Sequence, residues 1–212
     1  MIHENRSKIN VPMCIAFILL CLTLITTHFT SEIYARYAVS AYGYDSAKTI
    51  AFGSLNIYET GDFTEDNKMM IIPGVDLNKK ATISFEGSET ASYIFLEITV
   101  TPSGRWERAE NNFYSLKINN KEIMNWSINT KWTYLTQANE GRYIYYQMIE
   151  SNKTFNENII ENDMITVSEY ISNADINSIN NIGDININFK ASAVQSTGFD
   201  SPQDAWDSII AQ

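Results

Sequence analysis

The stretch that decides the fold is YIFLEITV, residues 93–100. Side chains two positions apart lie on the same face of a β-strand, and here one face is wholly apolar: Ile94, Leu96, Ile98 and Val100. This period of two predicts a strand with one buried face. The opposite face mixes aromatic and polar residues: Tyr93, Phe95, Glu97 and Thr99. We therefore expect this strand at the centre of a sheet.

Further segments rich in β-branched and aromatic residues extend this pattern in both directions along the chain. They are Ile50–Tyr58, Ala81–Glu86, Phe113–Ile118, Lys121–Met124, Asn125–Ile128, Trp132–Leu135, Arg142–Ile149, Met164–Ser168 and Ile185–Ala193. The change of parity at Gly53-Ser54 predicts a β-bulge. Asn119-Asn120 predicts a hairpin turn because asparagine tolerates positive φ. The polar stretch from Ser151 to Asp163 is expected to be a connection without a strand.

One helix is predicted at the C-terminus. Ser201 is its N-cap, Pro202 suits the first turn, and Asp204 lies near the positive end of the helix dipole. The segment Glu169–Asp184 is compatible with a short helix or with an irregular loop. Nine or ten short strands without a βαβ rhythm predict an all-β fold, an antiparallel β-sandwich that is jelly-roll-like and forms a single domain over residues 36–212.

The N-terminal region has the features of a secretory signal. Basic residues Arg6 and Lys8 precede the apolar run Val11–Ile25, and the small residue Ala35 follows. A spanning helix needs about twenty apolar residues. We therefore predict a signal helix within residues 1–35, cleaved between Ala35 and Arg36 during export. The alternative is a retained signal that anchors the protein to the membrane.

Cleavage at this position would remove both cysteines and both histidines, Cys14, Cys21, His3 and His28. Zinc enzymes and catalysts of the Ser-His-Asp or Cys-His type depend on these residues. The remaining catalytic routes are a carboxylate pair or a catalytic Lys or Tyr, and no spacing among the acidic residues singles out a pair. We therefore expect that the mature protein is not an enzyme and has no catalytic residues.

Charge restricts the possible partners. The chain has 15 basic and 25 acidic residues, and the predicted signal holds two of each, so the remainder carries 13 − 23 = −10. Nucleic acid needs a basic surface, so it is not an expected partner. The acidic loop Gly61–Lys68 offers three weak calcium ligands: Asp62, Glu65 and Asp66. The loop lacks EF-hand spacing, which favours a solvated loop, and no other cofactor is expected.

Aromatic residues suggest a second kind of site. Four of them are candidates for a surface that stacks against sugars: Trp106, Trp126, Trp132 and Tyr134. Aromatic residues on neighbouring strands more often brace the strands against each other. The sequence favours this structural interpretation and leaves the binding interpretation open.

Short motifs at both ends carry a family resemblance. Ala35-Arg36-Tyr37, then Asp45-Ser46-Ala47-Lys48 and Ile50–Leu55, followed near the end by Lys190–Phe199 and Ala205-Trp206, resemble the TasA/camelysin-like proteins. These are secreted proteins of Gram-positive bacteria processed by a SipW-type signal peptidase.

The resemblance implies a jelly-roll sandwich at the cell surface or in the biofilm matrix, with self-association or matrix proteins as partners. In some relatives, the N-terminal arm of one subunit adds a strand to the next. Here the arm would lie within residues 36–45, with these strand-donor residues: Arg36, Tyr37, Ala38, Val39, Ser40, Ala41 and Tyr42. Camelysin is described as a metallopeptidase, and the loss of histidine argues against that activity here. We expect a structural subunit, with a surface module for glycan or host protein as the alternative.

Overall fold

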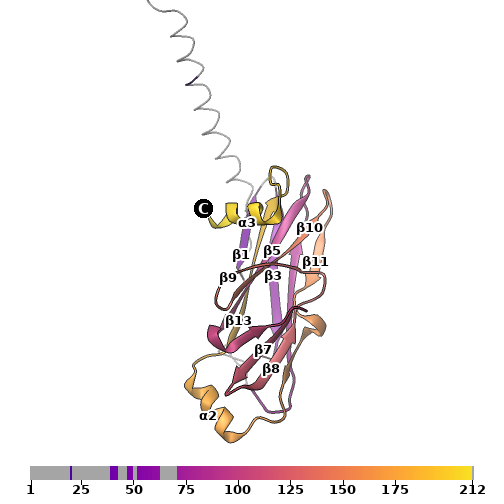
Figure 1. Ribbon diagram of the computed structural model, residues 1–212. Coiled ribbons are helices and arrows are strands. Elements are labelled where there is room, and N and C mark those ends of the chain that lie inside the picture. The colour runs from indigo at the N-terminus through magenta and orange to yellow at the C-terminus, as the bar shows by residue number, and fades with distance from the viewer. Residues whose placement is uncertain (1–19, 21–38, 43–46, 50–51, 63–70, 212) are drawn as a thin grey trace, which may run out of the picture. The chain divides into compact units, whose positions relative to one another are not determined.

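The computed structural model describes residues 20, 39–42, 47–49, 52–62 and 71–211. The chain divides into two compact units, Met1–Tyr37 and Ala38–Gln212. In the first unit only Leu20 is described. Apart from Leu20, the residues of the expected signal helix lie outside the described residues, as do the cleavage residues Ala35 and Arg36 and the arm residues Tyr37 and Ala38. All strands given below belong to the second unit (Figure 1).

The second unit contains two antiparallel sheets. The first sheet has five strands in the order β1-β13-β5-β10-β9. Their bounds are β1 (Val39–Tyr42), β13 (Asn186–Gln195), β5 (Ser92–Thr101), β10 (Arg142–Ile149) and β9 (Thr133–Asn139). The stretch YIFLEITV lies in β5, the middle strand. Its apolar face, from Ile94 to Val100, is fully buried. Both predictions for this stretch are confirmed.

The second sheet has eight strands, seven of them in the order β2-β3-β4-β12-β8-β7-β6. Their bounds are β2 (Ala47–Thr49), β3 (Phe52–Gly61), β4 (Leu77–Phe85), β12 (Met164–Val167), β8 (Lys121–Ser127), β7 (Phe113–Ile118) and β6 (Trp106–Arg108). The eighth strand, β11 (Phe155–Asn158), pairs with β4 beside β12. Two short 3-10 turns, η1 (Ser103–Arg105) and η2 (Glu161–Asp163), precede β6 and β12.

Aromatic side chains hold the two sheets face to face. Tyr114 of β7 contacts Tyr143 of β10 edge to face, with ring centroids 5.0 Å apart. Trp126 of β8 meets Phe189 of β13 at 6.2 Å. These rings are buried between the sheets. The predicted all-β antiparallel sandwich is therefore confirmed.

Local turn chemistry follows the sequence closely. Asn119 and Asn120 adopt φ values of 51° and 62° and join β7 to β8. The bulge expected near Gly53 appears as a register shift between β2 and β3. A side chain could not replace hydrogen at Gly53, because a Cβ atom there would lie 2.4 Å from the carbonyl oxygen of Gly87.

Two helices complete the unit. In α3 (Pro202–Ile210), the Ser201 hydroxyl accepts a hydrogen bond from the Asp204 amide, as predicted. Ala205 and Trp206 pack on Phe95 and its neighbours, covering one end of the outer face of the five-stranded sheet (Figure 1). The segment Glu169–Asp184 contains the helix α2 (Asn173–Asn181), which begins with a capping box.

Three expectations need correction. The connection Ser151–Asp163 contains β11, which pairs with β4. The two strands expected within Lys121–Ile128 are one continuous strand, β8. The described residues contain thirteen strands rather than nine or ten. Pairing with a distant strand stabilises a polar segment such as β11, and its own sequence carries no signal of that pairing.

Candidate functional site

The strand β13 is the candidate site because its neighbour β1 pairs with only four of its ten residues. All ten of its residues pair with β5 without a register shift. On its other side, β1 pairs only with the four residues Lys190–Ala193. Within the described part of the chain, the remaining β13 residues have no strand partner on that side. A strand that lacks a strand partner along part of one side is a template for adding another strand.

The inner face of β13 is apolar, which suits such an addition. Its side chains Ile187, Phe189, Ala191 and Ala193 are all at most 5% exposed. Lys79 lies over the Phe189 ring and forms a 2.8 Å ion pair with Glu59. The Lys79 side chain is buried, so it fills space against the inner face of β13.

Three strands at other described sheet edges, β9, β2 and β6, are less suited to pairing, whereas β3 has a comparable edge, since β2 pairs with it only at Phe52 and Leu55. The pairing of β9 with β10 has two register shifts, which distort the edge. The edge strand β2 has only three residues, and its pairing with β3 is also irregular. The edge strand β6 has three residues, two of them charged, Glu107 and Arg108. Short, bulged or charged strands resist pairing with a second chain.

The predicted strand-donor arm lies partly inside this site. Its residues Val39, Ser40, Ala41 and Tyr42 form β1 and face Ala193, Ser192, Ala191 and Lys190 in turn. We expected a free arm, but these four residues pair within their own sheet. The reason is that β13 offers unpaired backbone groups close to the start of the same unit. The sequence contained no signal that β13 would lie beside the arm.

Of the three predicted calcium ligands, the structure describes only Asp62. Its carboxylate Oδ2 accepts a hydrogen bond from the Asn78 amide at 2.9 Å. Glu65 and Asp66 lie outside the described residues. Asp62, Asp76 and Asp163 line an open pocket of about 410 Å³. Within the described ranges, no group of three or more His, Cys, Asp or Glu side chains is arranged to hold a metal ion.

The three candidate tryptophans are core residues. Trp106, Trp126 and Trp132 are 5%, 2% and 1% exposed. The indole N–H groups of Trp106 and Trp132 donate to the carbonyls of Thr101 and Asn158. A sugar cannot stack on rings that are covered in this way. They brace the strands, which is the interpretation that the sequence favoured.

The fourth candidate, Tyr134, belongs to a polar network that the sequence did not reveal. The Arg108 guanidinium lies 3.6 Å above the Tyr134 ring and donates to the Tyr145 hydroxyl at 2.8 Å. The Tyr145 hydroxyl also lies 2.9 Å from that of Tyr114. Burial raises the pKa of Tyr114 and of Tyr145. Both phenols therefore stay protonated at neutral pH, and the network links the two sheets.

No protein-family model, curated protein or solved structure matches this chain. Among the described residues, no helix is long and apolar enough to cross a bilayer.

Proposed function

We propose that this protein is a secreted structural subunit of the cell surface or biofilm matrix, which assembles when the N-terminal strand of one copy adds to β13 of the next. The observation that carries the proposal is the difference between the length of β13 and the part of it that β1 pairs with. β13 is a regular ten-residue strand, and β1 covers only four of those residues. The N-terminal signal pattern and the TasA-like motifs support export.

The free energy that keeps β1 paired with β13 is small enough for β1 to exchange between subunits. Four residue pairs of an antiparallel ladder contain about four hydrogen bonds, which contribute about 2–6 kcal/mol net. Ordering four residues costs about 4–8 kcal/mol of backbone entropy. These terms nearly cancel, so β1 would open readily and uncover the β13 edge.

The chain path limits how far β1 can pair within its own subunit. β1 ends at Tyr42, and β2 begins at Ala47 in the other sheet. The chain must therefore leave β13 after Tyr42. A strand from a second copy does not have to enter β2 of the subunit that receives it. It can follow more of the β13 edge, and signal removal would free the arm to do so.

Assembly of purified protein tests this proposal. We expect residues 36–212 to form large particles in light scattering, and residues 45–212, which lack the arm, to stay monomeric. A peptide of residues 36–44 should bind the truncated protein, whereas a scrambled peptide of the same composition should not. Circular dichroism checks that the truncated protein is folded.

Equal scattering from the two folded proteins would refute assembly through the arm. Failure of the peptide to bind a folded truncated protein would show that the β13 edge does not accept it.

A further inference from the structure

The link between β10 and β11 carries an acceptor motif for N-glycosylation. It reads Glu150-Ser151-Asn152-Lys153-Thr154. Asparagine followed two positions later by serine or threonine, with no proline between them, is the sequence at which glycans are attached to exported proteins. The acidic residue Glu150, two positions before Asn152, completes the longer motif that bacterial oligosaccharyltransferases recognise. The link is therefore a candidate modification site.

Asn152 is the only acceptor asparagine of the chain that has this acidic residue before it. Two other stretches match the short motif, Asn5-Arg6-Ser7 and Asn125-Trp126-Ser127, and they have histidine and isoleucine at the acidic position. Asn5 belongs to the predicted signal and lies outside the described residues. The sequence thus singles out Asn152, and Asn125 is the alternative that the structure can judge.

Exposure separates Asn152 from Asn125. All the residues from 150 to 154 are exposed, and they form the longest unbroken exposed run in the described part of the chain. Asn125 instead lies in β8, which pairs with β7 on one side and with β12 on the other. Its Nδ2 donates to Glu122 at 2.7 Å, and the neighbouring Trp126 is 2% exposed. A transferase can reach Asn152 without unfolding a sheet, whereas it cannot reach Asn125.

Backbone contacts hold the link on the domain and leave its side chains in solvent. The Asn152 amide donates to the Ser88 carbonyl at 2.7 Å, and the Lys153 amide donates to the Glu150 carbonyl at 3.3 Å. Asn152 has a φ of 57°, a left-handed conformation that asparagine tolerates. Within the described part of the chain, no hydrogen bond engages the side chains of Asn152 and Thr154. The two groups that define the short motif are thus available to a transferase.

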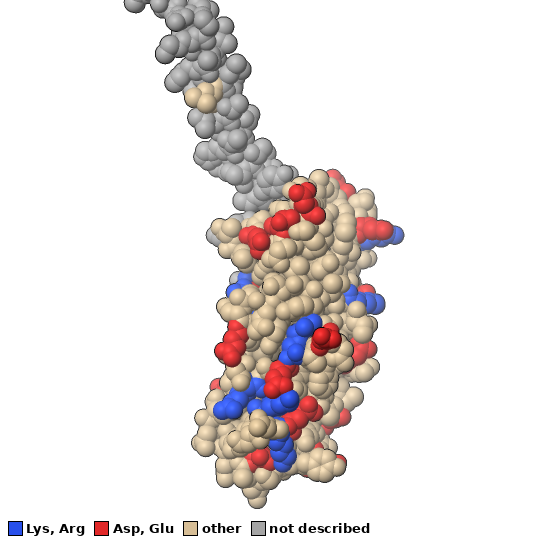
Figure 2. Space-filling view, in the orientation of Figure 1, with Lys and Arg blue, Asp and Glu red and all other residues tan. Residues whose placement is uncertain are grey.

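The position of the link suits a bulky modification. It follows Ile149, which pairs with Ser92 at the same end of the sandwich as α3 (Figure 1). Figure 2 shows acidic side chains gathered at this end of the unit. A transferase that recognises an acidic residue needs a basic group in its binding groove, so these charges favour the encounter. β5 separates β10 from β13 in the sheet, so a glycan on the link would not occupy the β13 edge.

We propose that Asn152 is an N-glycosylation site of the exported protein. The co-substrate is an oligosaccharide joined through pyrophosphate to a polyprenol lipid. In the transfer, a bond forms between Asn152 Nδ2 and the anomeric carbon of the sugar, and the bond from that carbon to the pyrophosphate oxygen breaks. Polyprenyl pyrophosphate leaves with the electron pair, and one amide proton passes to a base of the transferase. The site rests on export, which brings the chain to lipid-linked glycans, and not on strand addition.

Glycosylation in vitro tests the site independently of export and of assembly. The full chain in mild detergent would be incubated with a purified bacterial oligosaccharyltransferase and a fluorescent lipid-linked oligosaccharide. In-gel fluorescence measures the rate, and peptide mapping by mass spectrometry should place a single glycan on Asn152. Asn152→Gln and Thr154→Ala should abolish modification. Glu150→Gln should lower the rate about tenfold, the size of one lost charge-assisted contact.

The second described motif provides the matched control. Ser127→Ala removes the motif at Asn125 and should be modified like wild type, because Asn125 is covered in the folded domain. Circular dichroism checks that each variant is folded. Absence of product from folded wild-type protein, while a standard acceptor peptide is glycosylated in the same reaction, would overturn the proposal. So would equal yields from wild type and Asn152→Gln, or a loss in Ser127→Ala equal to that in Asn152→Gln.

Discussion

A disulfide between β1 and β13 provides a direct test of strand exchange. Ser40 and Ser192 are Cα partners in the β1–β13 pairing. Directly opposed residues in antiparallel strands have Cα atoms about 4.5–5.5 Å apart, which is within the range that a disulfide needs. Ser→Cys changes one atom of each side chain. The variant Ser40→Cys/Ser192→Cys, with Cys14 and Cys21 changed to serine, can therefore lock β1 in its own subunit.

The disulfide has two effects of different size. The two positions are 192 − 40 = 152 residues apart. Closing a loop of that length stabilises the protein against global unfolding by about 5 kcal/mol in the chain-entropy model. Opening of β1 leaves the rest of the unit folded, so this term does not act on strand exchange. The covalent bond itself does, because position 40 stays beside position 192 while the bond is intact, and exchange of the oxidised variant should therefore fall to background.

Light scattering measures the outcome. The oxidised double variant should stay monomeric, and reduction with dithiothreitol should restore assembly to the rate of the serine background. An equal mixture of the two single-cysteine variants should form disulfide-linked pairs on a non-reducing gel, because Ser40 of one copy would meet Ser192 of another. Equal assembly rates before and after reduction would refute exchange of β1. Absence of the mixed disulfide from assembled material would show that the strand does not add in this register.

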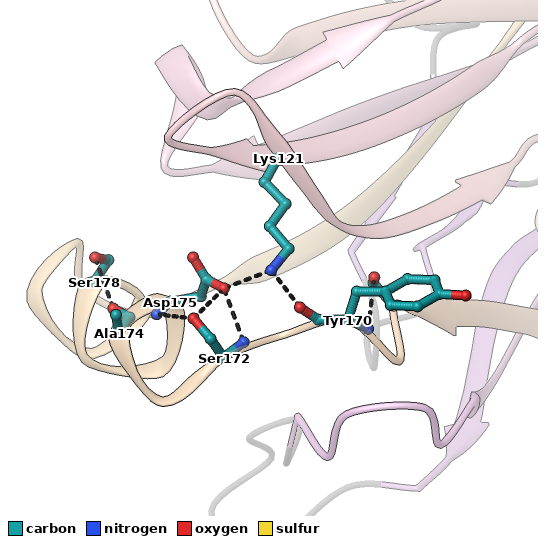
Figure 3. Close-up of polar contacts among 7 residues, drawn as sticks. Lys121, Tyr170, Ser172, Ala174, Asp175 and Ser178 are labelled. Carbon is teal, nitrogen blue, oxygen red and sulfur yellow. Dashed lines mark hydrogen bonds and ion pairs between the residues drawn. The ribbon is translucent and has the colours of Figure 1, made fainter.

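Three further predictions concern stability. Trp132→Ala should cost about 3–5 kcal/mol in urea unfolding because the indole is 1% exposed, whereas Tyr170→Ala should change stability by less than about 0.5 kcal/mol; a mild effect of Trp132→Ala would contradict its place in the core. Hydrogen bonds from Lys121 and Ser172 lower the pKa of Asp175 (Figure 3), so the contacts of the Asp175 carboxylate contribute stability above the unfolded pKa of about 3.9 and lose it as the pH falls further. Proteolysis within residues 169–184 should therefore increase below about pH 4 in wild type, while Asp175→Asn should already be cleaved at neutral pH and show no such dependence. Burial raises the pKa of Tyr114, Tyr143 and Tyr145, so stability should fall as the pH rises above about 10, and these phenols should ionise in ultraviolet titration only as the protein unfolds; their ionisation in the folded state would contradict this.

Local features of the chain were predictable because neighbours in sequence determine them. The alternation in residues 93–100 depends only on the geometry of a strand, and it correctly predicted the buried face and the central position of β5. The turn at Asn119-Asn120 and the cap at Ser201 are also local, since each depends on the conformation or hydrogen bonds of a few adjacent residues. The sequence by itself thus determined the fold class and most of the strands.

Tertiary structure decided what the segments do, because that depends on which distant residues meet. The sequence suggested an N-terminal arm, but only the sheet order places Val39–Tyr42 beside β13. The sequence leaves Trp132 as a candidate for sugar binding, and its burial in the structure excludes that role. The ion pair between Lys121 and Asp175 joins residues 54 positions apart, and no local pattern marks that pair. Strand pairing and burial arise from long-range packing, whose free energy no short stretch of sequence encodes.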